Sequence, residues 1–152
     1  MSKHRKQQKQ PAFHPLVLAL GGILLLAVAA FFFLQSGDGG GTPELTVDQN
    51  SIDFGDVKNF TEKSFTITIT NTGDGVLRFT EQPYVQVLEG CCPPKLTTGS
   101  MVLKPGESTT ITADAFSMHP GMDGKHNYAV HLKSNDAAHP DVVVNVLSNW
   151  IQ

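Results

Sequence analysis

The chain has 152 residues, a formal net charge of −3, two cysteines and a hydrophobic fraction of 40%. This length allows one small domain plus an attachment. All fourteen acidic residues follow residue 34, but only seven of the eleven Lys and Arg do, so the chain beyond residue 34 is clearly acidic. A nucleic-acid partner is therefore not expected.

The first 34 residues differ in composition from the rest. Residues 1–15 carry four basic side chains and no acidic one, and residues 16–34 carry no charge at all. A helix of nineteen residues is roughly 28 Å long, close to the hydrocarbon thickness of a bilayer. We therefore expect a basic cytoplasmic segment at 1–15 and a transmembrane helix or uncleaved signal anchor at 16–34. The positive-inside rule predicts a single-pass protein of the cell membrane whose C-terminal domain is extracytoplasmic.

A cleavable signal peptide is the alternative, because Ala27-Val28-Ala29 resembles a small-residue cleavage site. An uncleaved anchor is favoured because the apolar run continues to Leu34, whereas cleaved signals have apolar regions of only about 7 to 15 residues. Residues 35–43 contain four glycines and predict a short flexible linker.

Residues 44–152 show the pattern of short strands separated by turn residues. Phe65, Ile67 and Ile69 alternate with threonines, which places the apolar side chains on one face of a strand. About seven such segments predict an all-β domain built as a β-sandwich. The predicted strands are 45–49, 65–70, 76–81, 84–89, 109–115, 128–134 and 142–150. The predicted inward side chains are Phe65, Ile67, Ile69, Leu77, Phe79, Val85, Val87, Ile111, Ala113, Tyr128, Val130, Leu132, Val142, Val144 and Val146.

Four short motifs follow one another in a specific order: Ile52-Asp53-Phe54-Gly55-Asp56-Val57, Asn71-Thr72-Gly73, Leu103-Lys104-Pro105-Gly106-Glu107 and Ser134-Asn135-Asp136. In this order they resemble bacterial immunoglobulin-like domains of the Hydin and major-sperm-protein type, which include a widespread bacterial group of unknown function. The resemblance covers roughly 44–150 and implies a seven-stranded immunoglobulin-like β-sandwich. It implies an adhesive or scaffold module and no particular catalysis. Many members of the bacterial group have Cys-Gly-Cys where this chain has Cys91-Cys92.

The two cysteines are adjacent, which makes a structural disulfide a poor explanation for them. Neighbouring Cα atoms lie about 3.8 Å apart, whereas disulfides usually join Cα atoms 4.4 to 6.8 Å apart, and a vicinal bridge closes almost no loop. Three interpretations remain for Cys91 and Cys92: a soft-metal ligand pair, a redox-active vicinal disulfide, or two loop cysteines with no role.

A second group of soft ligands follows about thirty residues later in a segment rich in turn formers. It contains Met118, His119, Met122 and His126. Thiolate, thioether and imidazole together favour Cu(I). Zinc is the second choice, since a Cys2His2 site is chemically reasonable, but adjacent cysteines depart from structural zinc spacing and zinc leaves the methionines unexplained. Loops cluster at the two ends of a sandwich, so both segments are expected to share one end.

The favoured function is binding or delivery of Cu(I) at the outer membrane face, with a protein partner for delivery. The alternative is a structural or adhesive interaction module without metal, and a thiol-redox role is the weakest choice because no Cys-x-x-Cys motif is present. The sequence contains no nucleophile elbow, phosphate-binding glycine loop or His-Glu-x-x-His motif, so an enzyme is not expected.

Overall fold

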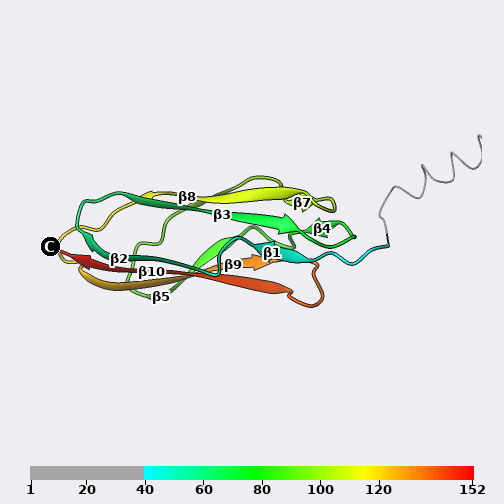
Figure 1. The fold of residues 1–152 in the computed structure, drawn as a ribbon. Helices are drawn as coiled ribbons and strands as arrows, with labels where there is room; N and C mark the ends of the chain where they lie inside the picture. Colours follow the sequence, from blue (N-terminus) through cyan, green and yellow to red (C-terminus); the bar gives the residue numbers. More distant parts are fainter. Residues whose placement is uncertain (1–39) are drawn as a thin grey trace, which may run out of the picture. The chain divides into compact units, whose positions relative to one another are not determined.

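The computed structural model describes residues 40–152, and in this part of the chain it shows two packed β-sheets and no helix (Figure 1). The strands are β1 (Leu45–Val47), β2 (Ser51–Lys58), β3 (Lys63–Asn71), β4 (Leu77–Arg78), β5 (Tyr84–Glu89), β6 (Leu96–Thr98), β7 (Val102–Leu103), β8 (Ser108–Phe116), β9 (Gly124–Lys133) and β10 (Asp141–Ile151). The first sheet has the order β1-β3-β8-β6, the second β2-β10-β9-β5, and β4 pairs with β7. The predicted all-β sandwich is confirmed.

Strands β3 and β8 form the centre of the first sheet, and their sequences explain why. Ile67 lies opposite Ile111 and both are fully buried, so the apolar residues of each strand face the second sheet. Thr66 and Thr112 point outwards, where their hydroxyls lie 3.3 Å apart. Period-two alternation of apolar and β-branched polar residues therefore fixes the register of this pair.

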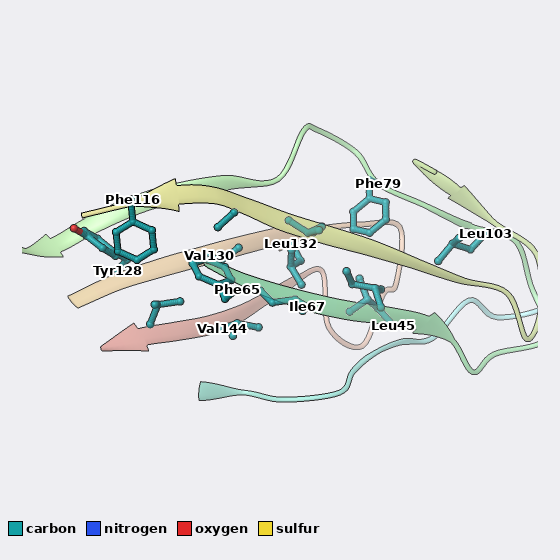
Figure 2. Close-up of a cluster of buried hydrophobic side chains, with 14 of the residues drawn as sticks. Leu45, Phe65, Ile67, Phe79, Leu103, Phe116, Tyr128, Val130, Leu132 and Val144 are labelled. Carbon is teal, nitrogen blue, oxygen red and sulfur yellow. The ribbon is translucent and has the colours of Figure 1, made fainter. Parts of the chain in front are cut away.

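The core lies between the two sheets and receives side chains from both (Figure 2). Most of the predicted inward residues are buried there, and Val85 and Val142 pack against it half-buried. Val87 is the exception, because it is 39% exposed on edge strand β5, next to a register shift between Val87 and Glu89. The alternation did not predict six core residues: Leu45, Val57, Leu103, Phe116, Met118 and Trp150.

The strand boundaries differ from the prediction at two places that shape the candidate site. Strand β2 was not predicted, since its acidic residues and Gly55 are typical of turns, but it pairs in parallel with β10. Gly55 has a φ of 61° there, and its N–H donates to the Asp53 carboxylate at 2.8 Å. Strand β9 begins at Gly124 rather than Tyr128, so His126 lies on a strand and opposite Ser148. Pairing with β10 supplies the extended structure that the polar sequence did not indicate.

The end of the predicted linker is part of the folded domain. The Thr42 N–H donates to the Asp74 carboxylate at 2.7 Å, and the Thr42 carbonyl accepts from the backbone N–H groups of Asp74 and Gly75. The predicted basic segment and transmembrane helix lie outside the described residues. No helix within residues 40–152 is long and apolar enough to cross a membrane.

Buried Asp136 anchors the beginning of β1 to the turn between β9 and β10. Its carboxylate accepts hydrogen bonds from the backbone N–H groups of Leu45 at 3.0 Å, Ala138 at 2.9 Å and His139 at 3.1 Å. Burial opposes ionisation of this carboxyl, but the three N–H donors outweigh burial and lower its pKa below the ordinary value.

This pKa shift predicts an acid-dependent loss of stability. Because the folded-state pKa lies below the unfolded value of about 3.9, the stabilisation is fully present above pH 5 and disappears as pH falls through the folded-state pKa. We expect Asp136→Asn to lower the free energy of unfolding at pH 7 by about 1 to 3 kcal/mol, since the amide group cannot accept all three bonds. The deficit should shrink towards pH 3. Urea unfolding of both proteins at several pH values measures it, and a deficit independent of pH would contradict the assignment.

Candidate functional site

The two soft-ligand segments meet at one end of the sandwich, as predicted. Cys91 and Cys92 lie in the connection from β5 to β6, and Glu89 at the end of β5 lies opposite Asn127 near the start of β9. The start of β9 also adjoins the C-terminal end of β10, where Gly124 lies opposite Trp150 (Figure 1). Residues 40–43, which we call the Thr42 segment, lie at the other end of the domain, because they precede Leu45, which bonds to Asp136 just after the end of β9. At 3.3 Å per residue, β9 itself is about 30 Å long from Gly124 to Lys133.

The structure brings four of the six predicted ligands together in a group that we call the sulfur–histidine cluster, Cys91, Cys92, Met122 and His126. The Sγ atoms of the two cysteines are 3.0 Å apart. The Cys91 Sγ atom lies 3.8 Å from His126 Nε2, and the Cys92 Sγ atom lies 4.0 Å from Met122 Sδ. Both cysteines are free thiols. The cluster therefore combines two thiols, an imidazole and a thioether.

Met118 and His119 are placed outside this cluster. Met118 is fully buried in the hydrophobic core, and its carbonyl accepts a hydrogen bond from the Phe60 N–H at 2.8 Å. The exposed His119 ring packs edge-on against the Phe60 ring at a centroid distance of 5.0 Å. Met118 therefore belongs to the core, while His119 lies at the surface.

Two residues with positive φ shape the cysteine loop. Gly90 has a φ of 87° and Cys92 a φ of 55°. A Cβ atom on Gly90 would lie only 2.4 Å from Cδ2 of His126, so the imidazole occupies the space that a side chain would need. Sequence reasoning did not identify Gly90, although a glycine before a thiol pair is a usable signal for close backbone approach. The Tyr128 hydroxyl also holds the loop by donating to the Cys91 carbonyl.

Burial and hydrogen bonds define the environment of the cluster. His126 is 3% exposed, and its Nδ1 lies 3.1 Å from the Gly124 carbonyl, which can only accept a hydrogen bond. Nδ1 is therefore the donor in this bond, and Nε2 faces the Cys91 thiol. The hydrogen bond with Cys92, then burial and the neighbouring Cys92 charge, raise the pKa of Cys91.

The raised pKa bears on the redox alternative. A reactive redox thiol needs a lowered pKa, because the thiolate is the nucleophile. The Cys91 thiol has the opposite shift, and its sulfur is not bonded to Cys92. The raised pKa therefore does not favour Cys91 as a redox nucleophile. Within residues 40–152, no group of three or more His, Cys, Asp and Glu side chains is arranged to hold a metal ion as it stands.

A shallow hollow of about 380 Å³ adjoins the cluster on the face of the second sheet. His126 contributes to its lining together with Asp53, Asp56 and Glu89. Lys125 also lines the hollow, so its ammonium group offsets part of the charge of the three carboxylates. The hollow is open, and nothing in its lining forms a catalytic group of nucleophile, base and orienting residue.

A second candidate site, which sequence reasoning missed, is the free edge of β5. This strand pairs only with β9, and its other side receives no backbone hydrogen bond from any described residue. Tyr84, Val87 and Leu88 are 38%, 39% and 52% exposed there. The consecutive apolar pair Val87-Leu88, which breaks the alternation of Val85, Gln86 and Val87, is the signal that could have indicated it.

The Tyr84 ring at this edge is held in place. It stacks on the His131 ring at a centroid distance of 4.9 Å and an angle of 8°, and the Lys133 ammonium lies 5.3 Å from its centroid. His131 is fixed in turn by Asp141 and Gln86, each 2.9 Å from one of its ring nitrogens. An aromatic side chain that is already ordered loses little entropy on binding. Tyr84 is thus suited to anchor a partner.

Comparison with known proteins agrees with the fold. The chain is similar to a protein of unknown function from Porphyromonas gingivalis W83, with 22% identity and a TM-score of 0.53, over 71% of this chain and 47% of that one. It is also similar to the secreted serine protease VesC from Vibrio cholerae, with 15% identity and a TM-score of 0.53, over 70% of this chain and 23% of that one. The Vibrio cholerae VesB protease is similar too, with 18% identity and a TM-score of 0.51, over 69% of this chain and 31% of that one.

The similarity covers less than half of the length of each of these three proteins, and at this level of identity it concerns the fold alone. No curated protein matches the sequence. The family model for the HYDIN/CFA65/VesB-like, Ig-like domain matches residues 43–148, which is most of the part of the chain that the structure describes. The resemblance inferred from four short motifs is confirmed at this level, and the chain belongs to the HYDIN/CFA65/VesB-like family of Ig-like domains.

Proposed function

We propose that the protein is a non-catalytic interaction module, tethered to the outer face of the cell membrane by residues 16–34, and that it binds a partner protein through the free edge of β5. The exposed apolar edge carries this proposal. Natural proteins usually protect sheet edges with short strands, charges or bulges. The other edges of the two large sheets are so protected: β1 and β6 have three residues each, and β2 carries Asp53 and Asp56 along its length, whereas the only charged residue of β5 is Glu89 at its end.

The β5 edge fits recognition by strand addition. Every second residue of an edge strand directs its N–H and C=O groups away from the sheet, and an extended peptide can pair with them while its side chains contact those of the edge. Tyr84 and Leu88 lie near the two ends of β5 and present exposed apolar surface to such a peptide. The expected partner is an extended protein segment with aliphatic or aromatic side chains.

Photo-crosslinking of the full-length protein in its membrane tests this function. A photoreactive residue at Leu88 should form a discrete crosslinked product, and one at Thr112, which is exposed on the outer face of central strand β8, should not. After the product is identified and purified, Leu88→Lys should weaken its binding about tenfold, equivalent to about 1.4 kcal/mol, because a charge blocks strand addition.

The matched control is Thr112→Lys, which adds the same charge to the opposite sheet and should leave binding unchanged. Thermal unfolding of both variants checks that the fold is intact. Equal crosslinking from the two positions, or unchanged binding by Leu88→Lys, would refute the proposal. A crosslinked product that consists of two copies of this chain would mean that β5 mediates self-association and does not bind a different protein.

A further inference from the structure

We propose that the sulfur–histidine cluster binds one soft monovalent metal ion of the Cu(I) class, with the thiolates of Cys91 and Cys92, Nε2 of His126 and Sδ of Met122 as ligands. The site lies at the end of the domain opposite the Thr42 segment. Tyr84 of the proposed interaction surface is at the other end of β5, opposite His131. Two thiolates, one imidazole and one thioether form a donor set that favours soft ions over Mg²⁺ or Ca²⁺.

Two separations within the cluster agree with ligands that share one ion. Metal–sulfur and metal–nitrogen bonds of about 2.3 and 2.0 Å place two ligands about 3.5 to 4.0 Å apart in a trigonal or tetrahedral site. The observed separations are 3.8 Å from Cys91 to His126 and 4.0 Å from Cys92 to Met122. Only the two thiols, 3.0 Å apart, are too close, and the exposed Cys92 side chain is free to rotate away.

The supporting structure already orients the ligands. The Nδ1–H group of His126 donates to the Gly124 carbonyl, which leaves Nε2 available to bind the metal ion. Metal-binding histidines usually donate their other ring N–H in this way. Gly90 leaves room for the imidazole beneath the cysteine loop. Cys92 has a φ of 55°, in the left-handed region that few non-glycine residues adopt, directly after Cys91.

The donor set favours Cu(I) over zinc. A structural zinc site has four Cys, His or carboxylate ligands, and this cluster offers three such groups with a neutral thioether as the fourth. A thioether is a typical ligand of Cu(I) and adds little to a zinc site. On binding, both thiols release their protons to the solvent and the ion keeps its oxidation state, so no electron donor is required.

Anaerobic titration of the reduced full-length protein in detergent, with Cu(I) supplied against a chelating competitor, tests the site. We expect uptake of one ion per chain. Cys92→Gly removes one thiolate but suits the positive φ, so the loop keeps its shape. Loss of an outer-shell group typically lowers metal affinity about 10- to 100-fold. We expect the loss of this thiolate ligand to lower the Cu(I) affinity by more than about 100-fold. Met122→Leu should weaken binding by about tenfold and change the metal–sulfur distances seen by X-ray absorption.

Met118→Leu is the matched control for Met122→Leu, because it replaces a methionine that is fully buried in the core. It should leave Cu(I) affinity unchanged. Leu88→Lys should also bind Cu(I) normally, so failure of the metal site and failure of the β5 interaction are distinguishable. No uptake, equal uptake by Cys92→Gly, or tighter binding of Zn²⁺ than of Cu(I) would overturn the proposal.

Discussion

Replacing Asn71 with aspartate is expected to lower the free energy of unfolding by about 3 to 4 kcal/mol, because one nearly isosteric change would leave two buried carbonyl groups without a donor. Asn71 is fully buried at the end of β3. Its Nδ2 donates to the carbonyl oxygens of Gly75 at 2.7 Å and Leu103 at 3.0 Å, and its Oδ1 accepts from the N–H groups of Glu44 and Gly73. This amide therefore joins four separate backbone positions.

The aspartate variant should also be sensitive to pH. A carboxylate facing two carbonyl oxygens is disfavoured, so its pKa should rise above about 3.9, and the protonated acid can restore one of the two hydrogen bonds. The stability deficit of Asn71→Asp should therefore be smaller at pH 4 than at pH 8. Urea unfolding followed by circular dichroism measures both values.

Asn135→Asp provides the matched control. Asn135 also joins backbone groups, donating to the Val76 carbonyl and accepting from the Arg78 N–H, but it is exposed to solvent. Water can replace the lost bond, so we expect a loss of less than about 1 kcal/mol. Equal losses in the two variants would show that the buried network around Asn71 is not what stabilises this end of the sandwich.

Replacing Trp150 with alanine is expected to cost about 3 to 5 kcal/mol, the usual range for deletion of a buried aromatic side chain. Trp150 is 1% exposed and lies edge-on to Phe116, with ring centroids 6.2 Å apart. Its Nε1 donates to the Ser148 hydroxyl at 3.0 Å, so its polar atom is satisfied inside the core. The residue also pairs with β2 and β9, next to the end that holds the sulfur–histidine cluster.

Ile151→Ala tests whether burial is the cause, since this neighbour on the same strand is 37% exposed. We expect it to lose no more than about 1 kcal/mol. Circular dichroism is the suitable probe, because Trp150 is the single tryptophan of the chain and its removal abolishes the fluorescence signal. A Trp150→Ala variant as stable as Ile151→Ala would mean that the end of β10 is not part of the cooperative core.

The sequence predicted the fold best where local pattern and burial coincide. The alternation in 65–70 identified the face of β3 that enters the core, because every second residue of a strand faces the same way. The order of four short motifs indicated the immunoglobulin-like family. The turn chemistry of Asp53 and Gly55 concealed β2, since its strand structure comes from pairing with β10 and not from its own composition.

The candidate site shows the same limit. Residue types alone identified the chemical character of Cys91, Cys92, Met122 and His126, because soft ligands are recognisable wherever they lie. Clustering along the chain also included Met118, which the structure places in the core, and His119, which contacts Phe60. Distance along the sequence does not determine which way a side chain points.

Sequence by itself thus determined the fold class, the acidic character of the domain and the kinds of donor atoms available to a metal. Tertiary structure decided which of those donors meet, that His126 lies on a strand beneath Gly90, and that β5 rather than another strand is the exposed apolar edge. The physical reason is that alternation, turn chemistry and ligand type are properties of neighbouring residues. Edge position and convergence of side chains arise only when segments thirty or more residues apart are paired.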